Sequence, residues 1–155
     1  MKAKTILIAC DHAGFSLKEI LKPYLAQCGF EVKDLGTYSK ERCDYPYFSA
    51  ALAAEISRGA YKRGILICKT GIGSSIVANR FPGVRASVCF NPKSARLTRE
   101  HNDSNVLVLG AAFVKGADAR RIAHTWINTR FLGGRHARRL AQIKTIEREI
   151  RGKRL

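Results

Sequence analysis

The sequence predicts an α/β fold in which a five-stranded parallel sheet carries helices on both faces and the chain ends in a further helix. Two observations lead to this prediction. Five short runs have the length and bulk of strands, and segments of helical periodicity separate them. Strands and helices that alternate strictly, with short connections, form an open, doubly wound αβα sheet whose ligands bind at the carboxyl ends of the strands.

The elements follow one another in a regular order along the chain. β-rich runs predict strands at residues 5–10, 31–34, 64–68, 84–89 and 106–109. Amphipathic runs predict helices at residues 16–28, 47–58, 74–80, 92–100 and 117–131, and a charged helix from about residue 135. Pro46, Pro82 and Pro92 all fall in predicted connections, which agrees with these boundaries.

Length and composition predict one domain that covers residues 1–155. A chain of 155 residues with 46% apolar content is large enough to bury a core. It contains no run of eighteen apolar residues and no signal peptide, so we expect a soluble, cytoplasmic protein without a membrane partner. Five widely spaced cysteines, without a Cys-x-x-Cys pair or clustered histidines, indicate neither a disulfide framework nor a metal site.

The charge is strongly basic, with 28 Lys and Arg against 12 Asp and Glu and a formal net charge of +16. Such a chain attracts polyanions without specificity. Many of the basic residues lie between residues 135 and 155, but no nucleic-acid-binding motif accompanies them. The composition therefore favours a basic surface that suits an anionic substrate over specific nucleic-acid binding.

Cys68 ends the third predicted strand and is the first candidate for chemistry. Gly71 and Gly73 permit a tight turn after it, from which the next helix would present unpaired backbone N–H groups. A helix N-terminus favours a thiolate over a thiol, and its N–H groups can stabilise an oxyanion beside the sulfur. The alternative is a buried cysteine that acts as a small apolar side chain. The spacing fits neither a P-loop nor Gly-x-Gly-x-x-Gly, which disfavours a nucleotide site.

Polar residues also follow the first two predicted strands. Asp11 and His12 come directly after the first strand, Tyr45 lies in the loop after the second, and Thr70 follows Cys68. Because the carboxyl ends of parallel strands share one edge of the sheet, these residues form one testable group. Each has a structural alternative, such as a helix cap for Asp11.

Two further groups lie outside that cluster. His101 and Asn102 fall between the fourth helix and the fifth strand, where they either end a helix or serve a neighbouring subunit's site. Arg135 and Arg139 are four residues apart on a predicted helix, so they share a face on which two guanidinium groups can grip one phosphate. A solvated helix start is the equally open alternative.

Five segments together resemble ribose-5-phosphate isomerase B, a family that also includes isomerases of six-carbon sugar phosphates. The resemblance spans nearly the whole chain, with the segments in the family's order. It implies a Rossmann-like three-layer αβα subunit, no metal or other cofactor, and a homodimer or dimer of dimers whose active sites use both chains. The segments are DHAGF (11–15), DYP (44–46), CKTGIG (68–73), HNDSN (101–105) and GGRHARR (133–139).

The resemblance implies the interconversion of ribose 5-phosphate and ribulose 5-phosphate through an enediolate. Cys68 matches the family's base, Thr70 would exchange protons with the sugar oxygens, and the partner chain's His101 matches the acid that opens the sugar ring. Backbone N–H groups between Lys69 and Gly73, through Gly71 and Ile72, would stabilise the enediolate. The remaining implied substrate-binding residues are Asp11, His12, Tyr45, Asn102, Arg135 and Arg139.

Two positions depart from the family pattern. Lys69 stands where the family usually has Gly, and Ala112 stands where it often has Arg. If that Gly is required for a positive φ, lysine strains the loop. If it is not, the ammonium can lower the pKa of a neighbouring thiol or replace the missing arginine's charge on the phosphate.

Three other functions remain open at this point. An isomerase of allose or galactose 6-phosphate type would use the same residues on a longer sugar. A nonenzymatic polyanion binder would show salt-sensitive binding to oligonucleotides and no response to pentose phosphates. A redox-responsive thiol protein would depend on reversible oxidation of Cys68.

Overall fold

A five-stranded, all-parallel sheet lies between two layers of helices in the computed structural model, which describes residues 4–152. The strand order is β2-β1-β3-β5-β4, so the three central strands are β1, β3 and β5. The predicted fold class, including the C-terminal helix, is confirmed. The strands are β1 Lys4–Cys10, β2 Phe30–Asp34, β3 Gly64–Cys68, β4 Ala86–Val88 and β5 Val106–Gly110.

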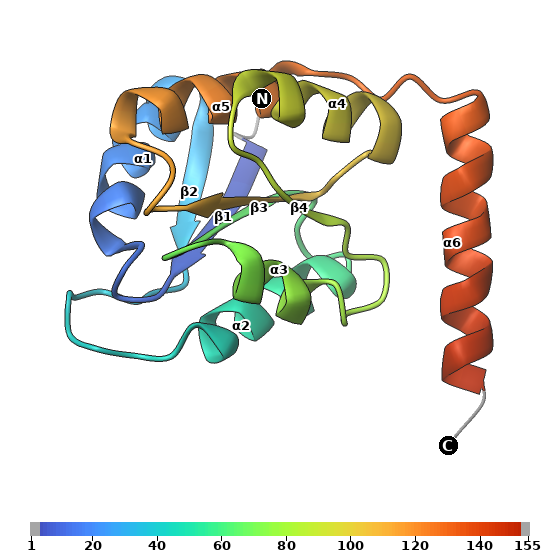
Figure 1. The fold of residues 1–155 in the computed structure, drawn as a ribbon, viewed down its shortest axis with the longest axis horizontal. Helices are drawn as coiled ribbons and strands as arrows, with labels where there is room; N and C mark the ends of the chain where they lie inside the picture. Colours follow the sequence, from blue (N-terminus) through green and yellow to red (C-terminus); the bar gives the residue numbers. More distant parts are fainter. Residues whose placement is uncertain (1–3, 153–155) are drawn as a thin grey trace.

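Two hydrophobic clusters fix the helices on the two faces of the sheet (Figure 1). Alternate residues of a strand point to opposite faces, so Ile6 and Ile8 of β1 join one cluster while Leu7 and Ala9 join the other. The first cluster packs under α1, α4 and α5, and the second under α2 and α3. These helices are α1 Phe15–Gln27, α2 Tyr45–Ser57, α3 Ile72–Ala78, α4 Pro92–Asn102 and α5 Gly116–Asn128.

Two helices, α2 and α3, begin two residues earlier than the sequence predicted, and both changes affect predicted site residues. Tyr45 is the first residue of α2 and not a loop residue, because Pro46 fits the first turn, where its missing N–H has no intrahelical partner. α3 begins at Ile72, after Gly71 in the left-handed region with φ 80°. Gly73 therefore lies inside the helix, and only Gly71 makes the turn.

Other boundaries differ where side chains compete with the backbone pattern. The predicted strand 84–89 is reduced to β4, because the N–H of Arg85 donates to the side chain of Asn105 (2.8 Å) and not to a strand. α4 continues through His101 to Asn102, so these residues belong to a helix and not to a connection. α5 ends at Asn128, since Thr129 has an extended ψ of 132°.

The last helix, α6 Arg135–Gly152, stands apart from the αβα body on the side away from α1 (Figure 1). His136 is its only buried residue. The Glu147 carboxylate accepts the N–H of Gly83 at 3.0 and 3.2 Å and so ties the helix to the loop before β4. Three isoleucines of this helix are exposed: Ile143, Ile146 and Ile150.

Within residues 4–152, no helix combines the length and the apolar character needed to cross a membrane.

Candidate active site

The loop after β3 surrounds a buried sulfur with backbone donors. Cys68 is the last residue of β3, and its side chain is buried. The positive φ of Gly71 turns the chain back so that its N–H donates to Cys68 Sγ at 3.1 Å. The N–H of Ile72 donates to Thr70 Oγ1 at 3.2 Å. The turn thus holds a backbone donor against the sulfur at the carboxyl end of β3.

Cys10 ends the neighbouring strand β1, and its environment is different. Burial raises the pKa of the Cys10 thiol to about 12, although the charge of Lys18 acts in the opposite direction. A thiol with that pKa stays protonated at neutral pH and is no base. Of the two cysteines that end adjacent strands, only Cys68 accepts the hydrogen bond from a following helical turn.

The loop after β5 packs against the Cys68 loop at the carboxyl ends of the strands. The Gly110 Cα faces the loop so closely that a Cβ there would lie 2.5 Å from the Thr70 carbonyl oxygen. The N–H of Ala112 donates to the carbonyl oxygen of Lys69 at 2.9 Å. The two positions that depart from the family pattern therefore lie side by side, joined by a backbone hydrogen bond. The Lys69 side chain is exposed.

Tyr45 reaches the same loop from α2. A Cβ built on Gly73 would lie 2.4 Å from Tyr45 Cζ and 2.6 Å from its Oη, so the phenol ring rests directly on the glycine. Tyr45 is 36% exposed. The absence of a side chain at residue 73 is thus what lets Tyr45 lie against the Cys68 loop.

Asp11 and His12 follow β1 and are held by their neighbours. The N–H of Asp11 donates to the Ile67 carbonyl oxygen (3.3 Å), and its Oδ1 accepts the N–H of Gly14 (3.0 Å). The Asp11 carboxylate therefore supports the start of α1, although Gly14 is the cap residue. His12 Nδ1 contacts the carbonyl oxygen of Cys43 at 3.0 Å and its N–H at 3.2 Å, which links the loops that follow β1 and β2.

A second group of site residues gathers where α4 meets the start of α6. The rings of His101 and His136 stack, with centroids 4.3 Å apart and planes at 10°. Burial, and then the positive charges of His101, Arg135 and Arg139, lower the pKa of His136. We call these four residues, with Asn102, the His101 cluster. His136 was not among the predicted site residues, although it lies between the two predicted arginines.

The His101 cluster lies at the opposite end of the sheet from Cys68. α4 ends at Asn102, shortly before β5 starts at Val106, whereas Cys68 pairs with Gly110 at the other end of β5. Five residues of a strand span roughly 16 Å. Within residues 4–152, no hydrogen bond or ion pair joins the cluster to the Cys68 loop. One chain therefore carries two separate groups of predicted site residues.

Comparison with known proteins shows which family this chain is related to. The chain matches the ribose/galactose isomerase family over residues 6–143. It is 46% identical over 144 residues to ribose-5-phosphate isomerase B from Escherichia coli, an alignment that covers 93% of this chain and 97% of the relative. This chain belongs to the ribose/galactose isomerase family.

Solved structures agree with this membership of the ribose/galactose isomerase family. Ribose-5-phosphate isomerase B from Clostridium thermocellum has a TM-score of 0.92 and 45% identity, covering 94% of this chain and 99% of that one. The Mycoplasma genitalium enzyme, solved with bound ribulose-5-phosphate, has a TM-score of 0.90 and 38% identity, covering 94% and 97%. Among the residues that the structure describes, no group of three or more His, Cys, Asp or Glu side chains is placed to hold a metal ion.

Proposed function

We propose that this protein interconverts ribose 5-phosphate and ribulose 5-phosphate, with Cys68 as the base. The observation that carries the proposal is the loop after β3, in which a buried sulfur accepts an N–H and further backbone donors stand free. Within residues 4–152, the N–H groups of Lys69, Thr70 and Gly73 have no hydrogen-bond partner. The relatives named above and the ribulose-5-phosphate complex of the Mycoplasma genitalium enzyme support the substrate.

The reaction then follows from the chemistry of an aldose. Cys68 removes the proton from C2, the electron pair of that C–H bond forms the C1–C2 double bond, and the carbonyl oxygen on C1 becomes an oxyanion. The free N–H groups of the loop stabilise that charge, as in an oxyanion hole. Thr70 Oγ1 accepts the Ile72 N–H, which leaves its own hydrogen available to exchange a proton between O2 and O1. Cys68 finally returns its proton to C1.

Asp11, His12 and Tyr45 are placed to hold the sugar beside this loop. Asp11 uses Oδ1 on Gly14, so its second carboxylate oxygen is available to a sugar hydroxyl. Tyr45 presents its hydroxyl over Gly73. These contacts would orient C1 and C2 toward the sulfur, and orientation of reacting groups contributes much of an enzyme's rate enhancement.

A second copy of the chain completes the site in this proposal. The His101 cluster lies at the amino ends of the strands and cannot reach Cys68 of the same chain across roughly 16 Å of sheet. His101 of a partner would donate the proton that opens the furanose ring, Asn102 would hold a hydroxyl, and Arg135 and Arg139 would bind the phosphate. The exposed isoleucines of α6 give such a homodimer, or dimer of dimers, an apolar contact surface.

Lys69 would supply the phosphate-binding charge that the family often places at residue 112. The backbone hydrogen bond between Ala112 and Lys69 puts the two positions side by side, and the exposed Lys69 ammonium lies on a long, flexible stem. The positive φ in this turn belongs to Gly71 and not to residue 69, so lysine there needs no left-handed backbone.

The proposal is tested by following ketose formation from ribose 5-phosphate and, separately, from allose and galactose 6-phosphates. Cys68→Ser should abolish turnover while folding and substrate binding persist, because a hydroxyl has a similar shape but is a far weaker base. Cys43→Ser, a cysteine outside the proposed chemistry, is the matched control and should remain active. Full turnover by Cys68→Ser would remove the sulfur from the mechanism, and preference for a 6-phosphate would reassign the substrate.

Chelation provides a separate check on the absence of a metal cofactor. Treatment with a chelator should leave the rate unchanged. Activity that is lost on chelation and restored by a divalent ion would replace this mechanism with a metal-assisted one.

A further inference from the structure

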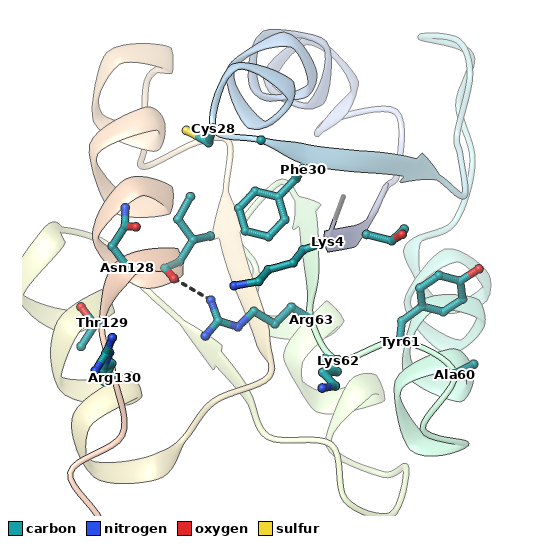
Figure 2. A pocket seen from close by; sticks show the side chains of 13 residues that line it. Lys4, Cys28, Phe30, Ala60, Tyr61, Lys62, Arg63, Asn128, Thr129 and Arg130 are labelled. Carbon is teal, nitrogen blue, oxygen red and sulfur yellow. Dashed lines mark hydrogen bonds between the residues drawn. The ribbon is translucent and has the colours of Figure 1, made fainter. Parts of the chain in front are cut away.

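A basic pocket lies at the amino ends of β1, β2 and β3, away from the Cys68 loop (Figure 2). Its volume is about 800 Å³, and no acidic residue is among those that line it. The described residues of the lining come from the start of β1, from the segments that lead into β2 and β3, and from the end of α5 with the two residues after it. Four of the lining residues are basic: Lys4, Lys62, Arg63 and Arg130.

Arg63 is the half-buried centre of this basic pocket. Its Nη1 donates to the carbonyl oxygen of Ile127 at 2.7 Å, and its guanidinium carbon lies 5.5 Å from the centroid of the Trp126 ring. Within residues 4–152, this is the only hydrogen bond of the guanidinium, and no carboxylate lies within ion-pair distance of it. Burial, and then the positive charge of Arg99, lower the pKa of Arg63.

Among the described residues that line the pocket, no carboxylate neutralises these charges. Figure 2 shows the ends of Lys4 and Arg63 both pointing toward the α5 side of the pocket. A half-buried guanidinium keeps most of its donors in a fixed fork, the geometry that suits phosphate. The side chains of Asn128 and Thr129 donate to carbonyl oxygens of α5 and so do not neutralise the guanidinium, and the Phe30 ring forms an apolar wall.

We propose that the basic pocket binds a small polyanion that carries at least two phosphoryl groups. Four cations exceed what one phosphate neutralises, and the volume lies in the range of sites for small organic ligands, roughly 300–1,000 Å³. The Cys68 loop is at the other end of the same strands, because β1 runs from Lys4 to Cys10 and β3 from Gly64 to Cys68. The described residues that line the pocket include none of the His101 cluster, so the two sites use different residues and this proposal does not depend on the proposed function.

The test measures binding of pyrophosphate, and separately of ADP, by titration calorimetry at fixed ionic strength. Pyrophosphate supplies the phosphoryl groups alone, whereas ADP adds a base that can stack on Phe30. Lys62→Gln should weaken binding of both probes roughly tenfold, the effect of losing one charge-assisted hydrogen bond. Arg63→Gln should weaken it more. Because Arg63 also packs on Trp126, the exposed Lys62 keeps the test valid if the Arg63 variant fails to fold.

Two control variants remove the same charge elsewhere. Arg80→Gln changes an exposed surface arginine, and Arg139→Gln changes the proposed substrate site. Arg80→Gln should not alter the affinity of either probe by more than about twofold at fixed ionic strength, because surface charges beyond a Debye length of about 10 Å are screened. Arg139→Gln should remove only a separate binding event at the proposed substrate site and leave the binding event of the basic pocket unchanged. Tighter binding of ADP than of pyrophosphate supports a nucleotide ligand, and equal binding supports a simple polyphosphate.

Three results would overturn the proposal. In the first, neither probe binds the wild-type protein at millimolar concentration. In the second, both probes bind to Lys62→Gln and to Arg63→Gln as tightly as they bind to the wild-type protein. In the third, Arg80→Gln or Arg139→Gln weakens binding as much as Lys62→Gln does, which would show that the net charge of +16 or the substrate site is responsible.

Discussion

Substitution of Gly73 by alanine should change stability in opposite directions depending on Tyr45. Gly73 lies inside α3, where alanine is favoured over glycine by up to about 1 kcal/mol. A Cβ at this position, however, would lie 2.4 Å from Tyr45 Cζ, far inside van der Waals contact. The phenol ring must then move off the Cys68 loop, which it can do because Tyr45 is 36% exposed.

The size of the effect follows from the surface that Tyr45 covers. A buried aromatic side chain removes about 150–250 Å² from water, so a ring that is two thirds covered accounts for roughly 130 Å². At about 25 cal/mol per Å² the upper limit is about 3 kcal/mol, reached only if the displaced ring loses every contact. With part of the packing kept and the helix preference subtracted, we expect Gly73→Ala to destabilise the wild-type protein by about 1–2 kcal/mol.

In a Tyr45→Ala background the obstacle is gone. Gly73→Ala should there stabilise the protein by about 0.5–1 kcal/mol, from the helix preference alone. The assay is urea denaturation of the four proteins at one fixed protein concentration, since a dimer's stability depends on concentration. Gly116→Ala, at the start of α5 on the other face of the sheet, is the control and should have the same effect in both backgrounds.

A coupling energy below about 0.5 kcal/mol between residues 73 and 45 would refute this reasoning, because contacting residues must fail to add. The contact also has a catalytic readout. Gly73→Ala should lower kcat/KM in the wild-type background, and it should have little further effect once Tyr45 is alanine.

Three further predictions follow. Lys69→Gly should raise KM and lower kcat/KM by roughly thirtyfold, the effect of losing a charged hydrogen bond of about 2 kcal/mol. Addition of Ala112→Arg to this variant should restore kcat/KM. A Lys69→Gly variant that is faster than the wild type and binds substrate as well would show that the lysine obstructs the site. Mixing Cys68→Ser with His101→Ala chains should recover part of the activity in steady-state assays. If subunit exchange is proven and no activity returns, a site shared between two chains is excluded. Asp34→Asn should destabilise the protein by about 3 kcal/mol at pH 7 by urea denaturation, because the buried Lys18 ammonium loses its partner at 2.5 Å. Burial raises the pKa of Asp34, but hydrogen bonds from Lys18, Lys22 and the Gly36 N–H outweigh it and lower the pKa, so this deficit should persist above about pH 4 and shrink below it.

The sequence predicted the architecture because periodicity reports directly on burial. β3 was predicted with its exact limits, since Gly64–Cys68 is apolar throughout and lies in the middle of the sheet. β4 was predicted to start too early, because the N–H of Arg85 donates to the side chain of Asn105, which is distant in the sequence, and no local pattern encodes that hydrogen bond. The limits of helices were mispredicted for a related reason, as Tyr45 shows. In a sequence, a proline that suits the first turn of a helix looks the same as a proline that interrupts one.

Site residues could be predicted as types and sequence positions, but not as neighbours. From the sequence, Gly73 was predicted to form part of a turn. In the structure, its missing side chain makes room for the ring of Tyr45, 28 positions earlier in the chain. The stacking of His136 on His101 was missed for the same reason, because α4 and α6 are distant in sequence and adjacent in space.

Lys69 and Ala112 show what this spatial information adds to a reading of the sequence. Separately, a lysine in place of glycine and an alanine in place of arginine each suggest a damaged isomerase. The parallel pairing of β3 with β5 ends at Cys68 and Gly110. Beyond it, the N–H of Ala111 donates to the carbonyl oxygen of Cys68 and the N–H of Ala112 to that of Lys69, both at 2.9 Å. In the function that we propose, Lys69 supplies the phosphate-binding charge of residue 112, so the two changes together leave the charge of the site the same. The register of β3 and β5 supports this proposal, because it places the two positions in neighbouring loops.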